Sequence, residues 1–223
     1  PGVIAVFQDN EHYESDDAYV GALAAAMTEE YETIAGADLV LQLDCPDLAM
    51  GRHVKFRDLS EDTFVRRAEQ LVEALNAALA NVPAEKVRMH ICWGNYEGPH
   101  DYDIPLRKIA KVLCRAKPQA LSFESSNPRH AHEWTVWGEI DLPDDKILVP
   151  GVIDTCTNYI EHPDLVAERI CRFADIVGRE RVIAGTDCGF STFIRYGHVL
   201  PDIAYEKIKV LAAGAATASN RLW

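Results

Sequence analysis

Short apolar runs alternate along this chain with longer segments whose apolar residues recur every three to four positions. Each short run ends in a residue with a polar or thiol group, and the runs cover residues 39–44, 87–92, 120–124, 147–154 and 181–188. Runs of this length that are followed by loop residues are typical of buried β-strands. The pattern therefore predicts five strands.

The longer segments between these runs predict amphipathic helices, because their apolar residues share one face when the chain is helical. Ser15, which two Asp residues follow, and Ser60 are suited to begin two of the helices. Pro163 lies at the start of another helix, and Gly178 follows its last apolar residue. Further helices are predicted after Pro105 and near the carboxyl end of the chain.

Alternating strands and helices predict βαβ crossovers and a parallel sheet. The residues at four successive strand ends, Cys92, Glu124, Asp154 and Cys188, are 32, 30 and 34 positions apart. Each interval has room for one loop, one helix and one strand. The regular spacing favours a (β/α) barrel, although a doubly wound open sheet would give a similar pattern.

His90 and Cys92 lie two residues apart in a predicted strand, so their side chains are expected on the same face. The carboxyl ends of parallel strands share one rim, which also brings Glu124 and Cys188 near this pair. Imidazole, thiolate and carboxylate groups are the usual zinc ligands. A His-x-Cys pair alone is weak evidence, because buried cysteines are common; polar groups at successive strand ends strengthen it.

Composition and charge narrow the classes of function. The chain has 223 residues and a net charge of -13, which disfavours a nucleic-acid binder with its basic surface. It has no apolar run long enough to cross a membrane. Six cysteines in a chain rich in regular structure favour reduced thiols and a cytoplasmic location over a disulfide framework. The length suits a single domain, residues 1–223.

Five short segments resemble motifs of one enzyme family. Residues 42–46, 90–92, 124–126, 150–154 and 187–189 read QLDCP, HIC, ESS, PGVID and DCG. In this order they resemble motifs of the C-terminal catalytic barrel of cobalamin-independent methionine synthase. The chain is most similar to the short, single-barrel members of that family.

The resemblance implies a TIM barrel of the superfamily shared with uroporphyrinogen decarboxylase. It implies Zn²⁺ bound by His90, Cys92, Glu124 and Cys188, and it assigns Asp44 to the amino group of homocysteine. The implied activity is that of a methyltransferase that moves a methyl group from 5-methyltetrahydrofolate, or a related donor, to a thiol such as homocysteine. Its expected partners are therefore small-molecule thiol and methyl-donor substrates, with neither nucleic acid nor membrane involved.

The chain departs from the family pattern at the proton donor. The family has a histidine two residues after the Asp of PGVID, and here Cys156 stands at that position. His162 follows six residues later, so Cys156 and His162 are both candidate proton donors. Another alkyl donor, or another acceptor thiol such as coenzyme M, also fits the remaining motifs.

The predicted strands number five, whereas a complete barrel has eight. We therefore expect an incomplete barrel, with residues 1–223 forming the C-terminal portion of a single catalytic-barrel domain. An open sheet edge would favour self-association. Two other interpretations stay open: a metal-free barrel lyase of the decarboxylase type, and a non-catalytic partial barrel with structural zinc.

Overall fold

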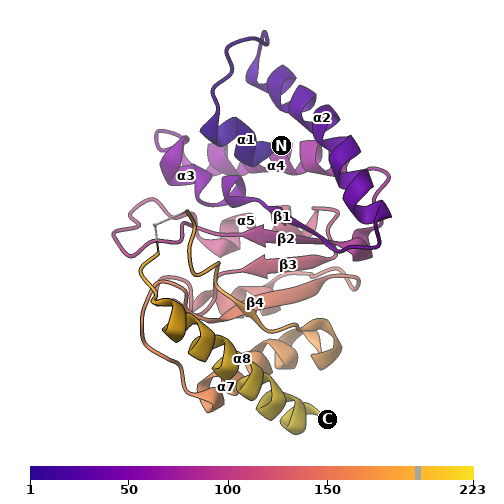
Figure 1. Cartoon of the computed structure of the whole chain (residues 1–223). Helices are drawn as coiled ribbons and strands as arrows, with labels where there is room; N and C mark the ends of the chain where they lie inside the picture. The colour runs from indigo at the N-terminus through magenta and orange to yellow at the C-terminus, as the bar shows by residue number, and fades with distance from the viewer. Residues whose placement is uncertain (194–196) are drawn as a thin grey trace. The chain divides into compact units, whose positions relative to one another are not determined.

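The structure, a computed structural model, describes residues 1–193 and 197–223. Figure 1 labels its helices and strands, and the chain divides into two compact units. The N-terminal unit comprises residues 1–93 and 100–121, and the C-terminal unit comprises residues 94–99 and 122–223. The chain therefore enters the C-terminal unit briefly after the second strand, before it completes the N-terminal unit.

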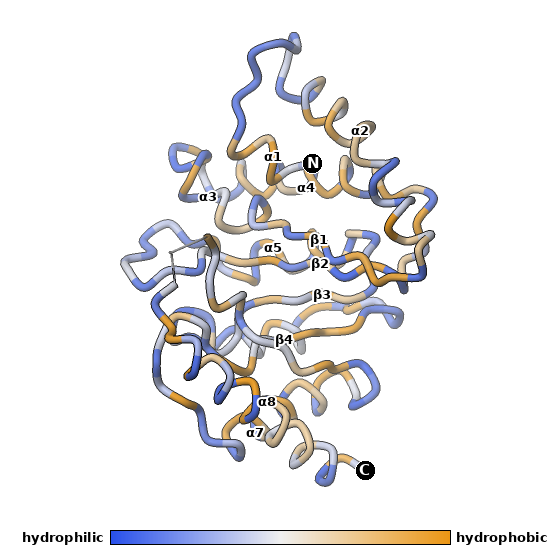
Figure 2. Tube along the Cα trace, in the orientation of Figure 1, coloured by the Kyte–Doolittle hydropathy of each residue, from blue (hydrophilic) through white to orange (hydrophobic). Residues whose placement is uncertain are grey.

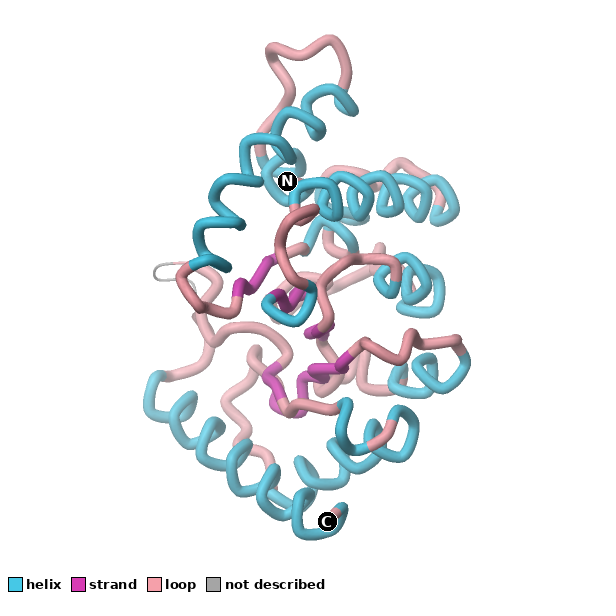
Figure 3. The backbone as a smooth tube through the Cα atoms, turned by 90° about the vertical axis from the view of Figure 1, so that its right-hand side faces the viewer, coloured by secondary structure: helices cyan, strands magenta, loops and turns pink. Residues whose placement is uncertain are grey.

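The strands of the described residues follow the order of the sequence in one sheet: β1 (Leu41–Asp44), β2 (Val87–Ile91), β3 (Ala120–Phe123), β4 (Ile147–Ile153) and β5 (Gly185–Thr186). β1 pairs in parallel with β2, and β4 pairs in parallel with β5. Figure 3 shows these strands in magenta. A doubly wound sheet reverses its strand order near the middle. The sequential order is that of a (β/α) barrel, which decides between the two arrangements that the spacing left open.

The observed strands begin later or are shorter than the apolar runs. Leu39 and Val40 precede β1 and are 57% and 64% exposed. The fifth run opens instead with a 3₁₀ turn, η4 (Arg179–Arg181), and Val182 forms only an isolated bridge to Leu148 before β5. The ladder pairing therefore begins later than the apolar runs at these two points.

Helices of the N-terminal unit are α1 (Gly2–Phe7), α2 (Asp16–Gly36), α3 (Gly51–Val54), α4 (Glu61–Ala78) and α5 (Leu106–Cys114). The 3₁₀ turns η1 (Pro46–Leu48) and η2 (Ala84–Lys86) precede α3 and β2. The Ser15 hydroxyl accepts a hydrogen bond from the Ala18 N–H, and the Ser60 hydroxyl accepts one from the Thr63 N–H. Both predicted helix starts are thus confirmed.

The core of the N-terminal unit forms where α4 packs against α2 and α5. The apolar face of α4 that the periodicity predicts is buried: Phe64, Ala68, Leu71, Val72 and Leu75. Burying a large aliphatic or aromatic side chain contributes about 1.5–3 kcal/mol. Figure 2 shows the connection between α1 and α2 as hydrophilic, in keeping with its exposure.

The C-terminal unit contains the turn η3 (Glu133–Thr135) and the helices α6 (Val136–Glu139), α7 (Pro163–Val177) and α8 (Pro201–Leu222). α7 begins at Pro163 and ends before Gly178, whose φ of 88° favours glycine, so both predicted ends are confirmed. α7 and α8 pack closely at Gly214, where a Cβ would lie 2.4 Å from Val166. None of the described helices has the length and hydropathy of a membrane span.

Candidate metal and substrate site

His90 and Cys92 lie at the carboxyl end of β2, and the alternation of the strand sets their direction. The residues between and before them face the core and are at most 1% exposed: Val87, Met89 and Ile91. The carbonyl of His90 accepts a hydrogen bond from the Cys45 N–H at 2.8 Å, and the carbonyl of Cys92 accepts one from the Met50 N–H at 3.1 Å. The turn after β1 thereby holds the end of β2 in place.

Asp44 is the register partner of His90 on the neighbouring strand β1. Paired residues of parallel strands share a face, so its carboxylate lies on the side of the sheet that presents His90. Burial raises the pKa of Asp44, the Cys92 thiol raises it further, and His90 lowers it. Asp44 lines a cavity of the N-terminal unit together with Gln42 and Tyr31. A small molecule could therefore reach this carboxylate.

Glu124 follows β3 directly and is only 3% exposed. Its Oε2 accepts hydrogen bonds from the Asn127 side-chain amide at 2.7 Å and from the Arg129 guanidinium at 2.9 Å. The buried carboxylate is thus held by a positive charge and an amide from the same loop.

Asp187 connects the segment of Cys188 to the loop that follows Glu124. Its carboxylate accepts backbone hydrogen bonds from the N–H groups of Ser125 at 2.8 Å, Ser126 at 2.9 Å and Asn127 at 2.8 Å. Burial raises the pKa of Asp187, while these donated hydrogen bonds act in the opposite direction. A carboxylate that accepts several backbone N–H groups holds a loop in one conformation.

Gly151 of the PGVID segment is required by the position of Asp187. A Cβ at residue 151 would lie 2.1 Å from the Asp187 Oδ1 and 2.6 Å from its Cα. Any side chain there would displace the backbone that places Cys188. The glycine of this motif therefore serves the close approach of β4 and the segment after β5.

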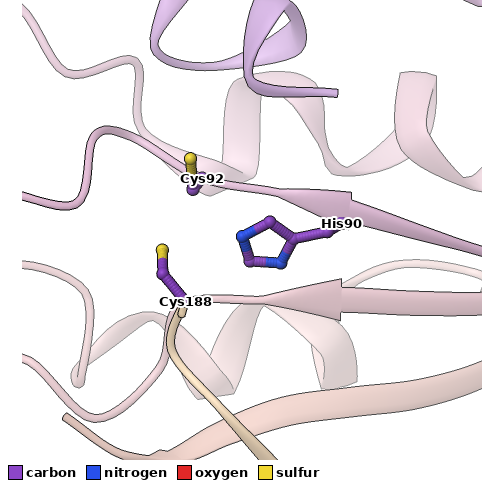
Figure 4. Close-up of side chains that lie close together, drawn as sticks. All are labelled: His90, Cys92 and Cys188. Atoms are coloured by element: carbon purple, nitrogen blue, oxygen red, sulfur yellow. The ribbon is translucent and has the colours of Figure 1, made fainter. Parts of the chain in front are cut away.

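His90, Cys92 and Cys188 form a group of side chains that could hold a metal ion (Figure 4). One imidazole nitrogen and two thiol sulfurs are donors that zinc prefers, so the residues present fit that ion. Among the described residues Glu124 is not a member of this group, and its Oε2 is engaged by Asn127 and Arg129.

The two candidate proton donors have different surroundings. The Cys156 thiol donates a hydrogen bond to the Asn95 Oδ1 at 3.3 Å. Burial, followed by the charges of Asp154 and Glu124, raises the pKa of Cys156 to about 12. This thiol keeps its proton at neutral pH. The His162 Nδ1 instead accepts a hydrogen bond from the Asp164 N–H, where it caps α7, and its side chain is 75% exposed.

Asn95 is a site residue that the sequence analysis missed. Its side chain accepts a hydrogen bond from the Thr155 hydroxyl at 2.9 Å and donates one to the Gly189 carbonyl at 2.7 Å. It therefore joins the loops that follow β4 and β5 in the C-terminal unit. The available signal was its position after Gly94, whose φ of 121° lets the chain turn sharply out of β2.

Comparisons with known proteins agree on one family. A family model described as the catalytic domain of cobalamin-independent synthase matches residues 6–197. The 2-hydroxypropyl-CoM lyase of Xanthobacter autotrophicus is 30% identical over 241 residues, which cover 96% of this chain and 58% of the lyase. The methionine synthase of Thermococcus kodakarensis is 25% identical, with 100% of this chain and 56% of the synthase covered. The chain thus spans somewhat more than half the length of these relatives.

A solved structure supports the fold independently of sequence identity. The B12-independent methionine synthase from Shewanella sp. W3-18-1, in complex with selenomethionine, matches with a TM-score of 0.74 at 20% identity. The match covers 95% of this chain and 58% of that chain. Together with the sequential strand order, this likeness confirms the expected fold class, an incomplete TIM barrel with about five of its eight βα units.

Proposed function

Because the chain belongs to the family of cobalamin-independent synthase catalytic domains, we propose that it holds zinc and serves methyl transfer to a small-molecule thiol. The donor is 5-methyltetrahydrofolate or a related compound, and the acceptor is a thiol such as homocysteine. The observation that carries the proposal is the candidate ligand group of His90, Cys92 and Cys188. Its nitrogen and sulfur donors are those of thiol-activating zinc sites.

Zinc, when bound, lowers the pKa of a coordinated thiol so that the thiolate forms at neutral pH. In this proposal His90 and Cys92 supply two ligands from one strand end, and Cys188 supplies a third from the segment held by Asp187. Glu124 is the proposed fourth ligand. The Arg129 guanidinium lies 2.9 Å from the Glu124 Oε2. To bind the metal, the Glu124 carboxylate would give up part of this contact.

Asp44 is the proposed contact for the amino group of the acceptor. The carboxylate faces a cavity and is the register neighbour of His90, so an amino acid whose thiol lies near His90 would place its ammonium group within reach. A partly desolvated carboxylate attracts an ammonium group more strongly than an exposed one does.

The nitrogen that loses the methyl group must gain a proton, so a general acid is needed. Cys156 is one proposed donor because its thiol is protonated at neutral pH, with its pKa raised to about 12. His162 is the other, because an imidazole is the side chain that most often serves as a general acid. If Cys156 donates, Cys156→Ser lowers methyl transfer strongly and His162→Ala does not; the opposite result assigns the role to His162.

A coenzyme M-type thiol is a second candidate acceptor. The observation in its favour is the 30% identity to a 2-hydroxypropyl-CoM lyase over 96% of this chain. Coenzyme M carries a sulfonate and no amino group. Turnover with homocysteine should therefore depend on Asp44, whereas turnover with a sulfonate thiol should persist, or improve, in Asp44→Asn.

Cobalt substitution tests the ligand assignment. The full chain is freed of metal and titrated with Co²⁺, and the near-ultraviolet charge-transfer absorption of thiolate bound to cobalt is recorded. Cys92→Ser and Cys188→Ser should each reduce this absorption. The control is Cys114→Ser, which replaces a cysteine at the end of α5 and should leave the absorption unchanged. Absorption that survives both substitutions would contradict the assignment to Cys92 and Cys188. A parent chain that shows no thiolate–cobalt absorption would favour a metal-free lyase or a binding protein.

Methyl transfer is measured separately as loss of free thiol in the presence of a methyl donor. The chain covers 58% or less of the length of the lyase and the synthase that it matches. This assay therefore decides whether residues 1–223 suffice for turnover. A chain that binds cobalt through its thiolates but alkylates no thiol would retain the site and lack the activity.

A further inference from the structure

A second cluster of metal-ligating side chains lies wholly within the N-terminal unit. His53 belongs to α3, and His100 and Asp103 belong to the loop between β2 and α5. The Nδ1 atoms of both imidazoles lie near the same carboxylate oxygen: that of His100 is 3.1 Å and that of His53 is 3.4 Å from the Asp103 Oδ1. One ligand atom from each residue falls within 4.8 Å of the other two.

These separations are those of atoms around a metal ion. Nitrogen and oxygen ligands lie about 2.0–2.2 Å from zinc and similar ions. Two such ligands at octahedral or tetrahedral angles are then roughly 3.0–3.5 Å apart. The His100–Asp103 and His53–Asp103 distances fall in that interval, so both pairs have the spacing of ligands around one ion.

The segment that carries His53 is held in place by its own hydrogen bonds. The Arg52 guanidinium donates to the carbonyls of Phe56, at 3.2 Å, and Arg57, at 2.8 Å. The Arg57 guanidinium lies 4.1 Å from the centre of the Tyr102 ring. This cation–π contact joins the region of α3 to the loop of His100, with Tyr102 standing between the two loop ligands in sequence.

The loop is also held at its far end. The Trp93 indole N–H donates a buried hydrogen bond to the Ile104 carbonyl at 2.7 Å. Residues on either side of the loop are thereby fixed next to Asp103. Ligands whose supporting residues are fixed lose little conformational entropy when they bind an ion.

The cluster is desolvated yet open to an entering ion. The side chain of His100 is 2% exposed, and those of His53 and Asp103 are 15% and 13% exposed. A carboxylate in these surroundings is stabilised by a nearby positive charge. A divalent cation would supply this charge to Asp103 and engage both imidazoles at once.

We propose that His53, His100 and Asp103 form a second metal site, with two nitrogen donors and one oxygen donor, for a first-row divalent cation such as Zn²⁺, Co²⁺ or Fe²⁺. Imidazole donors disfavour Mg²⁺ and Ca²⁺, which take oxygen ligands. Three protein ligands leave positions for water or a substrate oxygen. The site contains no sulfur and does not depend on the proposed methyl transfer, which uses other residues.

The test uses the full chain with Cys92→Ser and Cys188→Ser, which removes the thiol ligands. This double variant should still bind one Co²⁺ per chain, with visible d–d absorption and without the thiolate charge-transfer absorption. Adding Asp103→Asn, which keeps the side-chain shape, or His53→Ala should weaken this binding by about tenfold or more. His12→Ala, an exposed histidine of the same unit, should leave it unchanged.

Circular dichroism and thermal unfolding of each variant separate metal loss from unfolding. The proposal is overturned if the double cysteine variant is folded and binds no Co²⁺, or if its Co²⁺ affinity is the same with and without Asp103→Asn. These results also differ from failure of the thiol site, which would leave the parent chain without thiolate–cobalt absorption.

Discussion

The ammonium group of Lys207 lies 2.7 Å from the Oε2 of Glu161, and the two side chains are 0% and 9% exposed. Lys207 also donates to the Tyr159 carbonyl, and the other oxygen of Glu161 accepts the Asp154 N–H at 2.8 Å. The ion pair therefore links α8 to the loop that follows β4. A charge buried this deeply is stable only while its partner is present.

Replacing one partner of this pair should destabilise the protein strongly. Lys207→Met leaves the Glu161 carboxylate buried and unpaired, which should cost about 3–5 kcal/mol in free energy of unfolding. Urea unfolding measures the change. The double variant Lys207→Met/Glu161→Gln should recover part of the loss, and Lys209→Met, at an exposed lysine of the same helix, should cost little. Equal losses in the single and double variants would contradict a charge effect.

Asp187→Asn should weaken metal binding, although Asp187 belongs to no ligand group. The N–H groups of the new amide would face backbone N–H groups that now donate to the carboxylate. Hydrogen bonds to a charged acceptor, each worth about 1.5–3 kcal/mol, would be lost. The loop after β3 and the position of Cys188 should then loosen. Cobalt titration should give lower affinity with the thiolate absorption retained at saturation. Asp202→Asn, at the exposed first turn of α8, is the matched control.

Two helical glycines should respond in opposite directions to alanine. In Gly214→Ala the new methyl would lie 2.4 Å from Val166 and 2.9 Å from the Pro163 carbonyl, so α7 and α8 must separate. We expect a loss of about 1–3 kcal/mol in free energy of unfolding. Gly21→Ala in α2 meets nothing within 4 Å and should stabilise by up to about 1 kcal/mol. If Gly214→Ala left the free energy of unfolding unchanged in thermal or urea unfolding, α7 and α8 would pack less closely than these distances indicate.

Tyr31 should make the free energy of unfolding fall more steeply as the pH rises in alkaline solution. Burial, with smaller additions from Cys45 and Glu30, raises the pKa of Tyr31 to about 12. In the unfolded chain tyrosine ionises near pH ~10, so between these values the native state holds a proton that the unfolded state releases. The folded state accordingly loses stability as pH rises through this interval, with no loss below it.

The comparison with phenylalanine isolates this effect. From about pH 9.5 to 11.5 the free energy of unfolding should fall less in Tyr31→Phe than in the parent chain. Tyr205→Phe, at a residue 68% exposed, should follow the parent. Parallel curves for all three proteins would show that Tyr31 ionises as in the unfolded chain.

Features set by neighbouring residues could be predicted from the sequence. The alternation of β2 placed His90 and Cys92 on one face because the period of a strand is two. Ser60 was identified as a helix start because its hydroxyl bonds to a backbone N–H three residues away. The assignment of zinc to His90, Cys92, Glu124 and Cys188, and of roles to Asp44, Cys156 and His162, stays a prediction.

Features that depend on distant residues were missed. The bonds between Asp187 and the backbone of Ser125 join residues 62 positions apart, which no local pattern encodes. His53 lies in α3, a helix of four residues that is too short to show a period. The choice between a barrel and a doubly wound sheet depends on strand order, and both orders arise from the same alternation of strands and helices.

The route of the chain through residues 94–99 has a consequence for fragments of the protein. This segment precedes residues 100–121 of the N-terminal unit and nevertheless belongs to the C-terminal unit. Cleavage after residue 121 would therefore leave Asn95 on the first fragment and its partners Thr155 and Gly189 on the second. The second fragment should consequently fold best when it is mixed with the first, because residues 94–99, which complete the C-terminal unit, lie on the first fragment.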